Sequence, residues 1–307
     1  MLVSADGRTV VSNLGWVDRG RLWLFDVGVR HERVIDLGQA THLSLHLGSD
    51  DHFAVAHHYD GSRFEITVHH FSRIEVPIAR AVVDTDGARL TGDSSAWACV
   101  PTNYTGYITS RAWKDFCLVR IEPAELRIEV ERFGWYDESY DKGYQGVTGV
   151  TEIPGRTELL VSVQRSSRLV IYDPIARTKA GDVKLAGRGG NPTLFFRRRA
   201  NELWADDYDT LLKLEPGSWR TLASRRMQRR WLGSRQFIGQ FWFDHEESVC
   251  LVARPFSGDI VALDPRTLRT VATCTTQAQP LEAVLVGEAN VIARDWKSGT
   301  LIAGRVS

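Results

Sequence analysis

Short apolar runs recur along the whole chain, separated by turns rich in Gly, Asp, Asn and Pro. In HLSLHL (42–47) and FEITVHH (64–70) the apolar residues fall at every second position. That period is typical of a β-strand with one buried face. Long amphipathic helices are hard to find. The pattern therefore predicts an all-β chain of many short strands joined by tight turns.

Two segments share one internal order: ELLVSVQRSSRLVIYDPIARTKAGDVKL (158–185) and SVCLVARPFSGDIVALDPRTLRTVATC (248–274). Each reads as a strand, a polar turn, a strand ending in Asp-Pro, a short turn and another strand. Weaker copies extend this to seven anchor positions: Asp26, His70, Glu122, Asp173, Glu215, Asp264 and Gly304. Intervals of about 40–50 residues are typical of β-propeller blades. We predict a single domain, residues 1–307, forming an all-β, seven-bladed β-propeller of four-stranded antiparallel blades.

The two clear copies resemble the YVTN-type repeats of seven-bladed propellers in the lactonase-like and quinoprotein-dehydrogenase-like superfamily. The resemblance includes the Pro-containing entry to the next blade, at Asn191-Pro192 and Gln279-Pro280. The repeat period agrees along the whole chain, and the repeat motif is recognisable in residues 158–307. The resemblance implies a seven-bladed propeller architecture. Some members are lactonases or lyases, but their catalytic residues cannot be matched here one by one. No activity therefore follows from the resemblance.

The last repeat ends after 300–306 without a fourth strand. This leaves 27 predicted strands, with either the first or the last blade one strand short. An open strand edge invites pairing with another chain. We expect the N-terminal stretch Met1–Ser4 to cover that edge.

One face of the predicted propeller holds the turns between the second and third strands of each blade, together with the connections between blades. We call it the looped face. Three long connections are predicted there: 102–115, 134–146 and 225–236. Loops beyond the minimum length usually serve binding. We expect these three to wall a cleft over the central channel.

The candidate binding residues on this face combine aromatic rings, acids and arginines. They are Tyr104, Trp135, Tyr140, Asp141, Tyr144, Gln145, Asn191, Asp207, Arg229, Arg235, Arg254, Glu282 and Asp295. Aromatic rings with carboxylates suit a sugar ring, a cation or a basic peptide, and arginines suit phosphate or carboxylate groups. The alternatives, aromatics packed on one another and arginines on a solvated rim, stay open.

Seven of the nine histidines lie between Thr41 and Phe71, but strand geometry separates them. His52 and His58 stand at opposite ends of one predicted strand, roughly 20 Å apart at about 3.3 Å per residue. Only His42 and His58, with Asp60, remain as candidate ligands of a zinc-like divalent metal ion. The alternative is that these histidines are hydrogen-bonded and packed between blades.

Lys and Arg total 38, as do Asp and Glu, so the formal net charge is zero. This balance disfavours a surface devoted to nucleic acid or to an anionic membrane, and no apolar run approaches the roughly 20 residues of a membrane span. The four cysteines, Cys99, Cys117, Cys250 and Cys274, lie in strand-like segments without CxxC spacing. They predict buried free thiols. With no secretory signal at the start, they predict a cytoplasmic location.

The sequence holds no G-x-S-x-G elbow, no HExxH, no Walker loop and no GxGxxG after a strand. Two classes of function stay open. The favoured one is a non-catalytic binding propeller that docks a protein partner or a small polar ligand on the looped face. The alternative is an enzyme, a hydrolase or lyase of a sugar or lactone, acting at the channel mouth with or without a divalent metal ion. No other cofactor is predicted.

Overall fold

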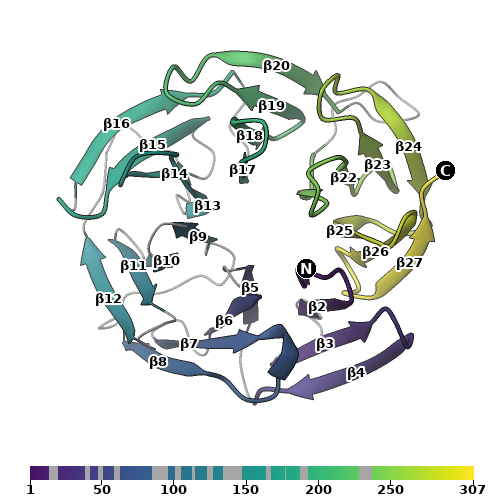
Figure 1. Cartoon of the computed structure of the whole chain (residues 1–307), viewed down its shortest axis with the longest axis horizontal. Helices are drawn as coiled ribbons and strands as arrows, with labels where there is room; N and C mark the ends of the chain where they lie inside the picture. The colour runs from purple at the N-terminus through teal and green to yellow at the C-terminus, as the bar shows by residue number, and fades with distance from the viewer. Residues whose placement is uncertain are drawn as a thin grey trace. The chain divides into compact units, whose positions relative to one another are not determined.

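The computed structural model describes residues 1–13, 20–38, 42–47, 51–58, 63–84, 96–100, 105–112, 115–122, 127–133, 147–163, 167–176, 178–186, 193–227 and 237–307. The chain divides into two compact units. Unit 1 comprises residues 1–35 and 195–307, and unit 2 comprises residues 36–194. Each unit is a set of antiparallel sheets whose strands lie side by side in sequence order (Figure 1).

The described part of unit 1 holds four sheets. The first contains β1 (Leu2–Val3), β2 (Thr9–Asn13), β3 (Arg21–Asp26) and β4 (His31–Asp36). The second contains β17 (Leu194–Arg197), β18 (Glu202–Asp207), β19 (Thr210–Leu214) and β20 (Thr221–Arg226). The third contains β21 (Phe241–Phe243), β22 (Cys250–Arg254), β23 (Asp259–Leu263) and β24 (Thr270–Thr275). The fourth has three strands, β25 (Pro280–Val286), β26 (Asn290–Asp295) and β27 (Leu301–Arg305).

The described part of unit 2 holds three four-stranded sheets. The first contains β5 (His42–Leu47), β6 (His52–His58), β7 (Arg63–His70) and β8 (Ala79–Asp84). The second contains β9 (Ala96–Val100), β10 (Thr105–Ala112), β11 (Asp115–Glu122) and β12 (Arg127–Phe133). The third contains β13 (Val147–Glu152), β14 (Leu159–Val163), β15 (Arg168–Asp173) and β16 (Thr178–Lys184). A single 3₁₀ turn, Phe71–Arg73, is the helical content of the described chain, and no helix there is long and apolar enough to cross a membrane.

The predicted repeat is confirmed at the third strand of every sheet. Each of the seven anchor positions lies within that strand or one residue after it. The recurring acid has a local cause, because its carboxylate accepts hydrogen bonds from the turn that follows. Asp173 Oδ1 accepts from the backbone N–H groups of Ile175 (2.8 Å) and Ala176 (2.9 Å). Asp26 and Asp264 cap their turns in the same way, as Asp residues commonly do.

The cores of unit 1 lie between consecutive sheets. Trp204, Phe243 and Leu263 belong to one buried cluster formed by the second and third sheets. A second cluster joins the third and fourth sheets. A strand that is buried on both faces has a near-continuous apolar run in its sequence. CLVA in β22 and DIVAL in β23 are examples.

The N-terminal stretch does not cover the edge of the last sheet, so this prediction is wrong. Leu2 and Val3 pair with Val11 and Val10 of β2, which makes β1 the first strand of its own sheet. The two sheets meet through side chains instead. Met1, Val10 and Trp23 pack against Val284, Val286 and Ile292. The expectation that the first or last blade is one strand short is met by the last sheet, which has three strands.

The prediction of a long connection at residues 102–115 is also wrong. Residues 105–112 form β10, which pairs with β9 and with β11 in continuous register. Its sequence, TGYITSRA, has the β-branched and aromatic residues of a strand, but Gly and Ser made it resemble a loop. The long connection of this region instead joins β8 to β9, and its residues 85–95 lie outside the described chain.

Candidate functional site

Four aromatic side chains meet on the looped face of unit 1, and we call them the aromatic cluster: Tyr208, Phe237, Phe256 and Trp296. Each comes from a different connection. Three occupy the turns β18–β19, β22–β23 and β26–β27, and Phe237 lies in the connection from β20 to β21. The ring centroids of Phe256 and Trp296 are 5.6 Å apart, and Phe237 lies 6.2–6.4 Å from the other three rings.

The cluster is exposed to an extent unusual for large rings. Tyr208 and Phe256 are each 44% exposed and Trp296 is 37% exposed. Aromatic rings in edge-to-face contact stabilise one another, yet these leave much of their area in water. Exposed contiguous apolar patches mark interaction sites more often than the scattered apolar side chains of an ordinary surface. The cluster is therefore the strongest candidate site in the described part of unit 1.

Backbone hydrogen bonds fix the turns that present these rings. The N–H of Ile238 donates to the carbonyl of Tyr208 (2.8 Å), and the N–H of Trp296 donates to the carbonyl of Gln279 (2.8 Å). Tyr208 itself adopts a positive φ of 60°, which is uncommon outside Gly and Asn. Hydrogen bonds thus join the connections between sheets to the turns beside them and fix the backbone positions from which the rings project.

Charged residues around the cluster mostly serve the turns. Arg254 donates to both oxygens of Asp259 (2.8 and 2.5 Å), and the pair closes the β22–β23 turn that carries Phe256. Asp295 Oδ1 accepts from the N–H of Gln279 (2.7 Å), and Oδ2 accepts from the N–H and hydroxyl of Ser298. Burial alone raises the pKa of Asp295, but these hydrogen bonds outweigh it and lower the pKa. Asp295 is therefore ionised at neutral pH.

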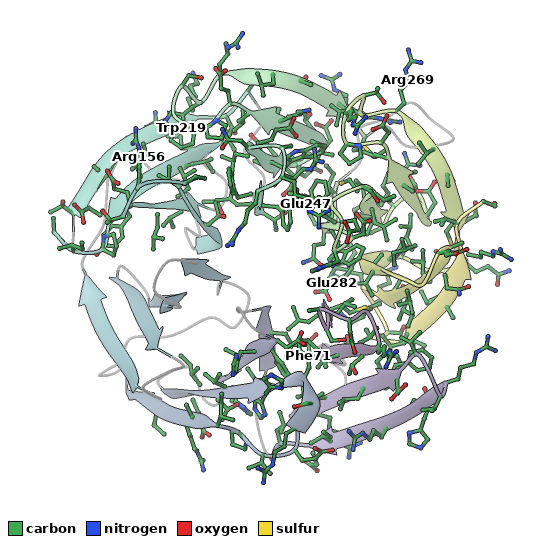
Figure 2. All side chains as sticks on the ribbon, viewed as in Figure 1. Phe71, Arg156, Trp219, Glu247, Arg269 and Glu282 are labelled. Atoms are coloured by element: carbon green, nitrogen blue, oxygen red, sulfur yellow. The ribbon has the colours of Figure 1, made fainter. Side chains whose placement is uncertain are left out.

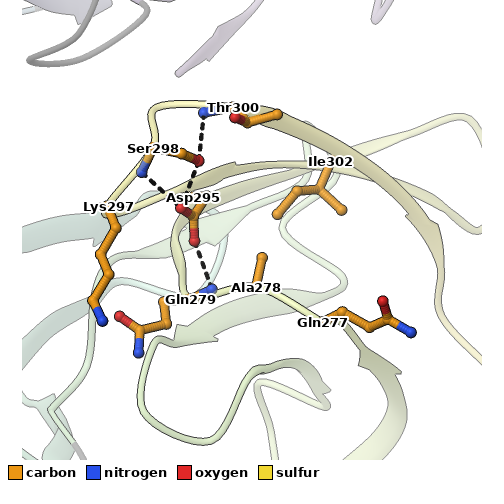
Figure 3. Close-up of a pocket in the computed structure, with 8 residues that line it drawn as sticks. All are labelled: Gln277, Ala278, Gln279, Asp295, Lys297, Ser298, Thr300 and Ile302. Carbon is orange, nitrogen blue, oxygen red and sulfur yellow. Dashed lines mark hydrogen bonds between the residues drawn. The ribbon is translucent and has the colours of Figure 1, made fainter.

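A pocket of about 470 Å³ opens beside the cluster, between the connection 276–279 and the β26–β27 turn (Figure 3). Its polar lining comes from Gln277, Gln279, Asp295, Lys297, Ser298 and Thr300, and its apolar lining from Ala278 and Ile302. Lys297 extends along the side of the pocket occupied by Gln279 (Figure 3). The volume is within the range of small-ligand pockets.

The structure brings only part of the predicted site together. Arg254 and Asp295 lie in neighbouring turns of the looped face, and Asp207 is buried directly before Tyr208. Glu282 contacts the Met1 ammonium (2.6 Å) and Arg294 (2.7 Å) and is labelled in Figure 2. Burial alone raises the pKa of Glu282, but the two cations outweigh it and lower the pKa strongly. The other candidates lie outside the described residues: Tyr104, Trp135, Tyr140, Asp141, Tyr144, Gln145, Asn191, Arg229 and Arg235.

The three candidate metal ligands are described only in part. The backbone register pairs His42 with His58 across β5 and β6, as the prediction requires. Their side chains and the whole of Asp60 lie outside the described residues. Elsewhere in the described chain, no group of three His, Cys, Asp or Glu side chains could hold a metal ion. The metal site stays a prediction.

Two other histidines in the same sheet are buried and hydrogen-bonded. His69 Nδ1 lies 2.7 Å from the carbonyl oxygen of Ile74, so Nδ1 carries the proton and Nε2 accepts from the Thr67 hydroxyl (2.8 Å). Thr67 Oγ1 can then only accept from His57 Nε2 (3.0 Å). This assigns the Nε2–H tautomer to His57. Its buried Nδ1 has no hydrogen-bond partner among the described residues.

Acidification is expected to destabilise this sheet. Burial lowers the pKa of His57 to about 4, against an ordinary value of 6.5. The unfolded chain therefore binds more protons between pH 6.5 and 4, and stability that is complete above pH 6.5 falls through this window by up to about 3 kcal/mol. Urea unfolding at pH 7 and pH 4.5 measures the loss. His57→Gln should reduce this loss, and His69, whose pKa burial also lowers, accounts for the part that remains. His31→Gln, at an exposed position, should leave the loss unchanged; equal pH dependence in both variants would contradict the assignment.

The sequence reasoning missed the aromatic cluster. Its signal was present, because three turns at equivalent places in the repeat each hold one ring: DDYD, RPFSGD and RDWKSG. A single aromatic residue in a polar turn looks unremarkable on its own. Only the packing of successive sheets brings these distant positions together.

No protein-family model matches the chain, and no curated protein matches its sequence. Among solved structures, the chain is similar to the β-propeller domain of Cps50 (Swd1) from Myceliophteria thermophila, with a TM-score of 0.72 and 14% sequence identity. The similarity covers 100% of this chain and 95% of that one. At this identity it shows the fold alone. The predicted β-propeller class is thereby confirmed, and the chain has a β-propeller fold.

Proposed function

We propose that this chain is a non-catalytic binding propeller that docks a protein partner on its looped face. The observation that carries the proposal is the aromatic cluster, in which four rings from four connections form one partly exposed surface. Tyr and Trp are enriched at protein interfaces and dominate their binding energy. Propellers serve many functions, so the argument depends on this site and not on the fold.

Several finer elements belong to the same proposal. The predicted connection 225–236 directly precedes Phe237 in sequence and would extend the docking surface of unit 1. The predicted connection 134–146 belongs to unit 2 and would offer a binding surface there. The seven-bladed closure as a single domain, and membership of the YVTN-type superfamily, are supported by the anchor positions. A cytoplasmic location is supported by the free, buried thiols of Cys250 and Cys274. A small polar ligand would occupy the pocket beside Lys297.

The enzyme alternative gains no support from the described residues. Three acids beside the cluster, Asp209, Asp259 and Asp295, accept hydrogen bonds from their own turns or strands. Burial raises the pKa of the Cys250 thiol, which leaves it protonated and weakly nucleophilic. We therefore propose no hydrolase or lyase activity.

Photo-crosslinking from inside the cluster tests the proposal. A benzophenone amino acid would replace Phe256 in one protein and Val271 in a second, since Val271 is 59% exposed on the outer strand β24. In extracts of the native host, we expect a discrete protein adduct from position 256 and not from position 271. Equal adduct patterns from both positions, or none from position 256, would refute docking on this surface.

A further inference from the structure

The pocket beside the aromatic cluster has polar groups that its own turn does not use. Asp295 and Ser298 are occupied, because Ser298 donates to the carboxylate and accepts from the N–H of Thr300 (3.2 Å; Figure 3). Two groups remain. The Lys297 side chain is exposed and lines the pocket. Gln279 Oε1 is buried and has no hydrogen-bond partner among the described residues.

The Gln279 oxygen and the Lys297 ammonium group require different chemical groups on the ligand. A buried amide oxygen without a partner is unfavourable and is satisfied by an N–H donor. An ammonium group on a flexible stem attracts an anion, most simply a carboxylate. A peptide with an acidic side chain supplies a carboxylate and an N–H donor within a few ångströms, since its backbone carries the N–H.

The position of the pocket links it to the aromatic cluster. The connection 276–279 forms one wall, and the same connection is bonded to the turns that carry Phe256 and Trp296. Thr276 donates through its N–H to the carbonyl of Gly258 (2.8 Å), and Trp296 donates to the carbonyl of Gln279 (2.8 Å). A peptide side chain on the rings would therefore place the next residues of the peptide at the pocket.

Charge also favours an acidic partner. Arg254 is neutralised by Asp259. Lys297, directly after Trp296 in sequence, has no ion pair with any described acid. In sequence, residues 228–236 directly before Phe237 include Arg229, Arg230 and Arg235 and no acidic residue. An acidic peptide would complement Lys297 beside the cluster.

We propose that the looped face of unit 1 binds an extended acidic peptide segment of the partner protein. An aromatic or aliphatic side chain of the peptide packs on Phe256 and Trp296, and a neighbouring Glu or Asp enters the pocket. There its carboxylate pairs with Lys297 and the peptide N–H donates to Gln279 Oε1. This inference rests on the proposed docking function and adds the chemistry of the ligand.

Selection from a displayed library of random heptapeptides tests the proposal on the full chain. We expect enrichment of sequences with an acidic residue within two positions of an aromatic or aliphatic residue. The best peptide and its Glu→Gln version would then be titrated by fluorescence anisotropy. The acidic peptide should bind about fivefold more tightly, and less so at high salt, as for a partly exposed ion pair.

Three variants separate the two claims. Lys297→Met should abolish the preference for the acidic peptide while the Gln peptide binds as before, and Lys184→Met, on the outer strand of another sheet, should change neither affinity. Phe256→Ala with Trp296→Ala should remove binding of both peptides. A preference that survives Lys297→Met, or selected peptides without acids, overturns the pocket assignment alone. No enriched peptides, or enriched peptides that bind the double variant equally well, overturn the docking function itself.

Discussion

Replacing Glu202 with Ala is expected to lower the free energy of unfolding by about 3 kcal/mol. Glu202 accepts from Arg197 (2.7 Å), Lys213 (2.5 Å) and the indole N–H of Trp204 (3.2 Å). The side chains of both cations are only 10–11% exposed. Removing the carboxylate leaves two buried positive charges without their main partner, which is far less favourable than losing an exposed pair.

The network around Glu202 also joins two sheets of unit 1. Arg197 donates to the carbonyl of Glu247 (2.8 Å), which lies in the β21–β22 turn and is labelled in Figure 2. This second contact keeps Arg197 partly satisfied and limits the expected loss. Urea unfolding measures it. Glu246→Ala, which removes the exposed partner of Arg199, is the matched control and should leave the midpoint unchanged. An equally small effect of Glu202→Ala would show that the network does not hold the sheets together.

Replacing Phe243 with Ala is expected to destabilise the protein by about 3–5 kcal/mol, the usual loss for a buried Phe. Phe243 is 4% exposed. Its ring centroid lies 4.6 Å from that of Phe195 and 4.9 Å from that of Trp204. The guanidinium carbon of Arg197 lies 5.5 Å from the same ring centroid. The substitution therefore opens a cavity between two sheets and also weakens the charged network.

The control for Phe243→Ala is Val271→Ala, an exposed apolar position on β24. Substitutions at such positions usually change stability by less than about 0.5 kcal/mol. Thermal unfolding followed by circular dichroism would rank the two variants. Similar midpoints would mean that the contact between the second and third sheets of unit 1 contributes little to stability.

Local chemistry explains how much of the fold could be predicted. The Asp-Pro steps at Asp173 and Asp264 mark turns that the carboxylate itself caps, so the repeat is visible wherever the acid is present. The sequence around β10 has no Asp-Pro step, so this strand was wrongly assigned to a long connection at 102–115. The N-terminus was misplaced for a different reason. Sequence patterns show which residues are apolar, but not whether Met1 meets its neighbours by strand pairing or by side-chain packing.

The site was harder to predict because its members act through long-range contacts. Arg254 and Asp295 end the strands β22 and β26, and their hydrogen-bonding groups serve the turns that follow. The rings beside them, Phe256 and Trp296, are separated by about forty residues in sequence, in line with one blade repeat, and only the packing of successive sheets joins them. Contacts of this kind need the register of every intervening strand, which no single turn reveals.

The most direct test of the central claim is the affinity of the partner identified by crosslinking, measured with the full chain by isothermal titration. Phe256→Ala with Trp296→Ala should weaken binding by about 100-fold, because exposed aromatic residues at the centre of an interface dominate its energy. Val271→Ala should bind as the unaltered chain does, and the double variant should keep its unfolding midpoint. An unchanged dissociation constant for the double variant would contradict the account and place the binding surface elsewhere on the molecule.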